Sequence, residues 1–183
     1  KLVYDGAEHV SVASFSPRHY EHTIVVHGFA KAYSMTGWRL GYLAAPEPIA
    51  KAIDAIQSHS TSNPTSFAQK GAVAALNGPQ DHLKSWLAEY AKRRGFAHQR
   101  LNSIPGITCV NAKGAFYLFP NISRLGLKST EFCARLLDQE KVAAVPGIAF
   151  GADDYLRISY ATSLANIEKG LDRIERFARS LTK

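Results

Sequence analysis

The spacing of apolar residues changes along the chain and separates short strands from helices. Two apolar runs, Thr23–Val26 and Leu40–Ala45, are bounded by turn residues, which predicts two buried strands joined by a loop. Isoleucines then recur at helical spacing over residues 46–58, which predicts a helix that rests on this sheet. The polar run Ser58–Ser62 is expected to interrupt that helix, and a further helix is predicted over Ser66–Leu76.

A long helical stripe opens the second half of the chain, and strands and helices alternate after it. The stripe lasts about five turns at 3.6 residues per turn; its members are Leu83, Trp86, Leu87, Tyr90, Arg94, Ala97 and Leu101. Beyond Ile104-Pro105-Gly106 the pattern predicts strands at Ile107–Val110 and Ala115–Phe119, a helix at Thr130–Glu140, strands at Val142–Val145 and Tyr155–Ser159, and a last helix from Leu164 capped by Ser163. This order is typical of an α/β layer domain.

The stop signal Asn77-Gly78-Pro79 marks the expected domain boundary. With 183 residues, of which 46% are hydrophobic, the chain is long enough to bury a core. We therefore expect one domain over residues 1–78 and a second over 79–183, entered through the long helix. No apolar run reaches the roughly 20 residues of a membrane span, and the start lacks a signal peptide pattern, which favours a cytoplasmic protein that does not bind membranes.

Charge and metal-ligand spacing exclude several classes of function. The formal net charge is +7, but the basic residues are scattered. Their one cluster, Lys92–Arg94, is expected to face solvent on the long helix, so nucleic-acid binding is not predicted. Cys109 and Cys133 lack metal-ligand spacing and are expected to be small core residues, and none of the seven histidines has ligand spacing with a third ligand close by. We predict no metal site.

The stretch GFAKAYSMTGWRLGY carries the first candidate chemistry, in Lys31 and Arg39. Between buried strands without a nearby acidic residue, desolvation and the neighbouring guanidinium would lower the pKa of Lys31, which favours an amine nucleophile for a carbonyl. The planar fork of Arg39 suits a phosphate or carboxylate, and Gly28 and Gly37 would let backbone N–H groups approach the same anion. Spacing alone favours a simpler alternative, a solvated loop lysine and a charge at a strand edge.

Arg157 is the second candidate, because it lies inside the predicted strand YLRISY among apolar and aromatic residues. A half-buried guanidinium needs an anionic partner to offset its desolvation. From the sequence alone, a structural carboxylate such as Asp153 or Asp154 is the expected partner.

The segment GFAK followed by TGWRLGY resembles the cofactor-lysine segment of the class I aminotransferases, which have fold type I of the pyridoxal phosphate enzymes. The resemblance continues through STSNPTS, GAFYLFP, VPGIAFG and YLRISYATS and covers essentially the whole chain. It implies that Lys31 binds pyridoxal 5'-phosphate covalently and shuttles the substrate proton, and that Arg39 binds the cofactor phosphate. It further implies that Arg157 grips the substrate α-carboxylate, and that Ser60 and Thr61 lie near a dimer interface, within reach of the partner's phosphate.

The same resemblance implies an α/β fold made of part of a large domain, over residues 1–78, and a small C-terminal α/β domain. The family's aspartate for the pyridine nitrogen has no match here, so we expect a C-terminal half that is inactive alone. Many relatives carry a serine phosphate ligand where this chain has Gly28. The expected reaction is transamination between an amino acid and a 2-oxo acid in a homodimer. A non-catalytic folded fragment and a pyridoxal phosphate C–S lyase on the same scaffold stay open as alternatives.

Overall fold

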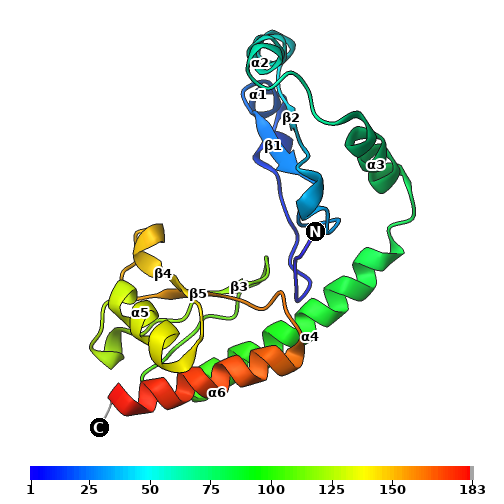
Figure 1. Cartoon of the computed structure of the whole chain (residues 1–183). Coiled ribbons are helices and arrows are strands. Elements are labelled where there is room, and N and C mark those ends of the chain that lie inside the picture. Colours follow the sequence, from blue (N-terminus) through cyan, green and yellow to red (C-terminus); the bar gives the residue numbers. More distant parts are fainter. Residues whose placement is uncertain (182–183) are drawn as a thin grey trace. The chain divides into compact units, whose positions relative to one another are not determined.

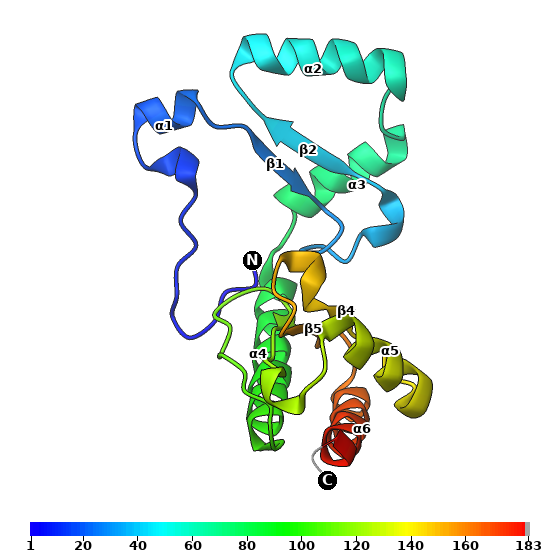
Figure 2. The same ribbon diagram turned by 90° about the vertical axis from the view of Figure 1, so that its left-hand side faces the viewer.

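The computed structural model describes residues 1–181, and its backbone contacts divide the chain into two compact units. The first unit contains Lys1 and Glu8–Lys84. The second contains Leu2–Ala7 and the chain from Ser85 onward. Figure 1 labels the elements of both units in chain order, and the second view shows the two strands of the first unit more openly (Figure 2).

The first unit is a two-stranded antiparallel ladder with helices before and after it. Its elements are α1 (Pro17–Glu21), β1 (Val25–Gly28), η2 (Thr36–Trp38), β2 (Gly41–Ala44), α2 (Glu47–Ser60) and α3 (Ser66–Asn77), after a short 3-10 turn η1 (Val12–Ser14). Val25 lies opposite Ala44 and Gly28 opposite Gly41. Helix α1 begins at Pro17, and the Ser16 hydroxyl caps it by accepting the N–H of His19 at 3.3 Å.

The prediction that both strands are buried is wrong. Val26 is 78% exposed, and no residue of β1, β2 or α2 reaches full burial. The isoleucines of α2 have the spacing of a buried stripe, yet Ile56 is largely exposed. A ladder of two strands has little surface to cover a helix face, and the only core of this unit is a small cluster made of Phe29, Met35, Leu40, Ala68 and Ala72.

The polar run Ser58–Ser62 does not interrupt α2 where the sequence predicts. The helix continues through Ser60 and is capped at Thr61. The Ser58 hydroxyl donates to the backbone carbonyl of Ala55 at 2.9 Å, so this polar side chain finds its partner within the helix. The following loop ends where α3 begins, as predicted.

In the second unit, helices pack on a three-stranded antiparallel sheet. Its elements are α4 (Asp81–Ser103), whose first turn is grouped with the first unit, β3 (Tyr117–Leu118), η3 (Ser123–Leu125), α5 (Ser129–Glu140), β4 (Val145–Pro146), η4 (Gly147–Phe150), β5 (Leu156–Ser159) and α6 (Leu164–Leu181), with strand order β3-β5-β4. The strand predicted at Ile107–Val110 is reduced to one isolated bridge, between Thr108 and Asn121. Cys109 N–H donates to the Asn102 side chain instead of a neighbouring strand.

The core of the second unit lies between α4, α5, α6 and the sheet. It is built from Ala97, Leu101, Ile104, Ile107, Cys109, Leu118, Ile122, Leu125, Phe132, Cys133, Leu136, Leu156, Tyr160, Ile167, Leu171, Ile174, Phe177 and Ala178. Both cysteines are buried free thiols, as predicted, and burial raises their pKa, that of Cys133 to about 11. None of the helices within residues 1–181 is long and apolar enough to cross a membrane.

Helices α4 and α6 lie side by side (Figure 1), and charged side chains join them. Arg100 reaches Asp172 at 2.6 Å and Glu175 at 3.1 Å. The N-terminus of α6 has the predicted cap, since the Asn166 N–H donates to the Ser163 hydroxyl at 3.2 Å. The C-terminal part of the α4 stripe, Ala97 and Leu101, belongs to the same core as the apolar face of α6, whereas Trp86 near the start of the stripe is 37% exposed.

The expectation that Arg94 faces solvent is wrong, because this side chain is only 5% exposed. Its guanidinium pairs with Asp5 at 2.7 Å, donates to the Ala112 carbonyl at 2.7 Å and lies 4.4 Å from the centre of the Tyr4 ring. The hydrogen bond from Arg94 lowers the pKa of the Asp5 carboxyl. Residues 2–7 thereby attach to α4, far along the sequence, and no local pattern announces such a contact.

Candidate functional site

Lys31 lies in the turn that follows β1, between the buried side chains of Phe29 and Met35. The turn is closed by backbone hydrogen bonds, from Tyr33 N–H to the Phe29 carbonyl at 3.2 Å and from Ser34 N–H to the Lys31 carbonyl at 3.3 Å. The two buried anchors hold the turn while the lysine side chain is exposed. The expectation of a lysine enclosed by buried strands is therefore wrong, because β1 and β2 are themselves exposed.

Arg39 lies at the end of the same loop, directly after η2, in a left-handed backbone conformation with φ 52° and ψ 45°. This conformation is uncommon for a residue with a side chain, and such residues cluster at functional sites. One Nη1 hydrogen is donated to the Thr36 carbonyl at 2.9 Å. A guanidinium carries five N–H hydrogens, so most of this donor set has no partner within residues 1–181.

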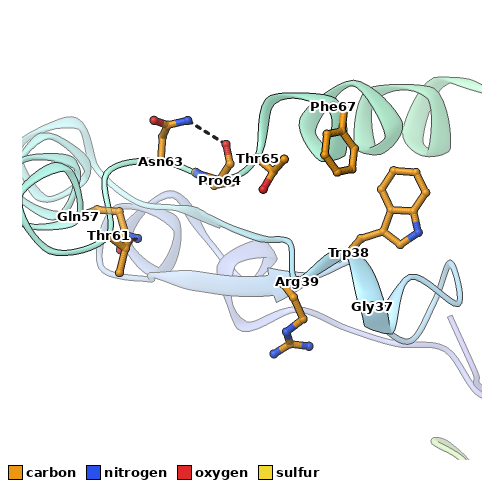
Figure 3. Close-up of a pocket in the computed structure, with 9 residues that line it drawn as sticks. All are labelled: Gly37, Trp38, Arg39, Gln57, Thr61, Asn63, Pro64, Thr65 and Phe67. Atoms are coloured by element: carbon orange, nitrogen blue, oxygen red, sulfur yellow. Dashed lines mark hydrogen bonds between the residues drawn. The ribbon is translucent and has the colours of Figure 1, made fainter.

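A cavity of about 580 Å³ opens beside Arg39 within the first unit. Its walls come from the loop around η2, the end of α2, the start of α3 and the segment that joins these two helices, as Figure 3 shows. They are Gly37, Trp38, Arg39, Gln57, Thr61, Asn63, Pro64, Thr65 and Phe67. Hydroxyl and amide groups line it together with two aromatic rings. This combination suits a ligand with a polar or anionic end and a flat apolar body.

The aromatic wall of the cavity is fixed by close packing on α3. The Trp38 and Phe67 rings meet edge to face with 6.2 Å between their centres (Figure 3). A Cβ atom at Gly71 would lie 2.6 Å from the Trp38 ring, so only glycine lets the indole approach the helix this closely. The position of Trp38 is set by a residue that the sequence analysis did not single out.

Most of the polar residues that line the cavity were not predicted as site residues from the sequence. Gln57, Asn63 and Thr65 were not predicted, whereas Thr61 lines the cavity and its neighbour Ser60 does not. The signal was the motif STSNPTS, whose residues Thr61, Asn63 and Thr65 join the same cavity lining as Arg39 only once α2 and α3 are placed.

The two glycines expected beside the anion behave differently. Gly37 lines the cavity. Gly28 lies in β1, where its N–H donates to the Nδ1 atom of His27 at 2.8 Å, so this N–H is already engaged. The contribution expected from the Gly28 N–H is therefore not found, and Gly37 is the one of the two that borders the cavity.

Arg157 lies on the central strand β5 of the second unit, opposite Val145 of β4. Its guanidinium carbon is 4.5 Å from the centre of the Tyr117 ring and 4.9 Å from that of Phe150. The residue is partly buried. The aromatic rings, rather than a carboxylate, are the neighbours that the structure gives this charge.

The carboxylate partner expected from the sequence is wrong, because both candidates are engaged elsewhere. Asp153 accepts the hydroxyl of the fully buried Ser129 at 2.6 Å. Asp154 pairs with Lys128 at 2.9 Å, and this contact raises the pKa of Lys128. Among the described residues no ion pair to Arg157 is formed.

The structure thus brings Lys31 and Arg39 onto one loop of the first unit and holds Arg157 in the second. Lys31 is not among the residues that line the cavity. Within residues 1–181, no three His, Cys, Asp or Glu side chains gather in a geometry suited to a metal ion.

Comparison with known proteins identifies the family. The model of the family "Aminotransferase class I and II" matches residues 1–174. This chain belongs to that family. The resemblance carried by the lysine loop and the later motifs is therefore confirmed over nearly the whole chain.

Individual relatives support the same family assignment. An aspartate aminotransferase of Geobacillus stearothermophilus is 48% identical over 97% of this chain and 46% of its own length. The solved aspartate aminotransferase of Rhizobium meliloti is 41% identical, with a TM-score of 0.92 over 97% of this chain and 47% of that chain. A PLP-bound protein of Clostridium difficile 630 is 25% identical, with a TM-score of 0.91 over 97% of this chain and 47% of that one.

The chain spans about half the length of the relatives it matches. Its α/β fold is that of part of a fold type I aminotransferase, which confirms the predicted fold class.

Proposed function

We propose that this chain is part of a pyridoxal phosphate-dependent aminotransferase that moves an amino group between an amino acid and a 2-oxo acid. The observation that carries the proposal is the family match over residues 1–174, with a lysine and an arginine on one loop beside a partly polar cavity. The names of the relatives favour aspartate as an amino donor.

The residues of the first unit fit a cofactor that bears a phosphate. Within residues 1–181 Arg39 uses one N–H for the Thr36 carbonyl and keeps most of its donors available, and hydroxyl and amide groups of Thr65 and Asn63 line the same cavity. Lys31 offers an exposed amine on a turn anchored by Phe29. When bound, pyridoxal 5'-phosphate supplies the electron sink for the reaction.

In this proposal Lys31 binds the cofactor covalently, then receives and returns the proton of the substrate Cα atom as a general base and acid. Arg39 anchors the phosphate, so the lysine turn and the anchor lie on the same short loop. Arg157 binds the substrate α-carboxylate through paired N–H groups, which orients the Cα–H bond for removal of its proton.

The domain assignment is part of the same proposal. Residues 1–78 would form part of the large cofactor domain and residues 79–183 the small domain, within a cytoplasmic homodimer. Ser60 and Thr61 would then approach the phosphate of a second copy. Because the chain spans about half the length of its relatives, we expect the 183-residue chain alone to lack transaminase activity and the complete enzyme that contains it to have it. An assay of amino-group exchange between an amino acid and a 2-oxo acid, with excess cofactor, measures the activity of the 183-residue chain and of the complete enzyme. Turnover by the 183-residue chain alone would overturn the proposal that its active site is incomplete.

Borohydride reduction of the complete enzyme with its cofactor tests the role of Lys31. Peptide mapping is expected to find the reduced cofactor on Lys31, and the label is expected to disappear in Lys31→Arg. Lys51, an exposed lysine of α2 paired with Glu47, is a matched internal control that stays unlabelled. A label on any other lysine refutes the proposed site.

Kinetics of Arg157→Lys test the substrate contact. Lysine keeps the charge but loses the paired N–H geometry, and truncating one partner of a desolvated charge pair costs about 2–5 kcal/mol. We expect kcat/KM for the amino acid to fall accordingly, while borohydride labelling of Lys31 is unchanged. Arg124→Lys, at an exposed position of η3, is the control. An unchanged kcat/KM for Arg157→Lys would return this arginine to a structural role.

A further inference from the structure

The two aromatic neighbours of Arg157 come from separate elements of the second unit. Tyr117 lies on β3 and pairs with Ser159 of β5, two residues beyond Arg157. In an antiparallel ladder this register makes Tyr117 and Arg157 diagonal neighbours on one face of the sheet. Phe150 ends the 3-10 turn η4. Its ring meets that of Phe119 edge to face, with 5.9 Å between their centres.

The turn that carries Phe150 is held firmly even though the ring itself is 49% exposed. Ile148 N–H donates to the buried hydroxyl of Ser129 at 3.2 Å, which ties the turn to α5. Gly147 N–H donates to the Tyr155 carbonyl at 2.8 Å. A Cβ atom at Gly147 would lie 2.1 Å from the Ala152 carbonyl oxygen, so the backbone closes tightly around this residue. A rigid turn therefore presents a partly exposed ring to the arginine.

Aromatic rings stabilise a guanidinium through their faces and leave its N–H donors unused. A carboxylate neighbour would occupy those donors, but Asp153 and Asp154 are held by Ser129 and Lys128. The surroundings of Arg157 thus restrict where the guanidinium lies without consuming the groups that bind an anion. This is the arrangement expected of an arginine prepared for a carboxylate ligand.

We propose that Tyr117 and Phe150 are positioning residues that hold Arg157 for the substrate α-carboxylate. The inference rests on the proposed function of Arg157 and adds that ring faces, not the Tyr117 hydroxyl, set the geometry. A cation–ring contact is worth about 2- to 30-fold in an equilibrium constant, depending on its exposure, and this bounds the pre-organisation of Arg157 that each ring can supply. Removal of either ring therefore raises KM for the amino acid within that range, while kcat changes less than about twofold, because the same contact is lost before and during the reaction.

The test uses Tyr117→Leu, Phe150→Leu and Tyr117→Phe in the complete holoenzyme. Tyr117→Phe keeps the ring and is expected to retain the parent KM, whereas both leucine variants raise it. Ile148→Ala, an exposed position on the same turn as Phe150, is the matched control and should keep the parent KM. Phe150→Leu changes a half-exposed side chain and is therefore expected to fold. This variant still tests the proposal if Tyr117→Leu fails to fold.

A second measurement separates positioning from a general structural effect. The holoenzyme is titrated with a 2-oxo acid and with the matching 2-oxo amide, which lacks the carboxylate charge. The leucine variants are expected to lose affinity for the acid and not for the amide, whereas a loosened fold would weaken both. If Arg157→Lys leaves kcat/KM unchanged, the proposed role of Arg157 fails. If Arg157→Lys is impaired but both leucine variants bind the acid normally, only the positioning role is overturned.

Discussion

Replacement of Phe132 by alanine is expected to lower the free energy of unfolding of the second unit by about 3–5 kcal/mol. Phe132 is 0% exposed and lies on α5, where its ring meets Phe177 of α6 edge to face with 4.9 Å between centres. The change leaves a cavity the size of a phenyl ring between two helices. Native domains are stable by only about 5–15 kcal/mol, so this one change removes a large share of the total.

The aromatic part of this energy can be separated from the burial. Phe132→Leu keeps most of the buried apolar surface and loses the ring pair, whose geometry contributes about 0.5–1.5 kcal/mol beyond burial. A double-mutant cycle of Phe132→Leu with Phe177→Leu is expected to return a coupling of that size. Leu137→Ala, on the same helix but 52% exposed, should change stability by no more than about 0.5 kcal/mol.

Urea unfolding of the 183-residue chain, followed by far-UV circular dichroism, gives these free energies. In a Cys109→Ser background, the rate of thiol labelling at Cys133 reports separately on the opening of α5, because this thiol is buried next to Phe132. A loss below about 1 kcal/mol for Phe132→Ala, or one equal to that of Leu137→Ala, would refute the packing of α5 against α6.

Three further predictions follow from single positions. Burial raises the pKa of Cys133 to about 11, so the folded state keeps a thiol proton that the unfolded state releases from about pH 8.5. The free energy of unfolding should therefore fall as the pH rises from about 9 to 11. In urea titrations, Cys133→Ala should flatten this pH dependence. Gly147→Ala should lower the unfolding midpoint strongly because its Cβ meets backbone oxygens, whereas Gly170→Ala, with open space in α6, should raise it slightly. Gly71→Ala should displace the Trp38 ring, seen as a red shift of tryptophan emission, and an unchanged spectrum would contradict the contact.

Helices were the part of the fold that the sequence predicted best. The apolar stripe of α6 and the breaks around α3 are local signals, and both helices start where those signals predict. Strand burial was not predictable, because the run around Val26 has buried composition but its exposure depends on what covers it. The prediction that Arg94 faces solvent failed for a related reason, because its partner Asp5 is 89 positions away in the sequence.

The residues of the candidate site likewise include some that local sequence signals predicted and others that they did not. Lys31 and Arg39 were found through a family motif within one loop. Their spacing alone favoured simpler roles, a solvated lysine and a charge at a strand edge. Gln57 of the cavity wall and Phe150 beside Arg157 carry no local signal, because each reaches the site through packing of distant elements. Sequence chemistry located the charged groups, and tertiary structure was needed for the uncharged groups around them.

The grouping of residues 2–7 with the second unit puts residues 8–84 of the first unit between two parts of the second. Tyr4 N–H donates to the Lys113 carbonyl and Ala115 N–H to the Leu2 carbonyl, both at 3.0 Å. Closing these contacts requires a loop that contains the whole intervening unit, at an entropic cost that grows only slowly with loop length. During synthesis at about 5–20 residues per second, residues 2–7 wait on the order of 10 s for these partners to emerge. The contacts of residues 2–4 with residues 113–115 therefore form only after residues 8–84 have left the ribosome.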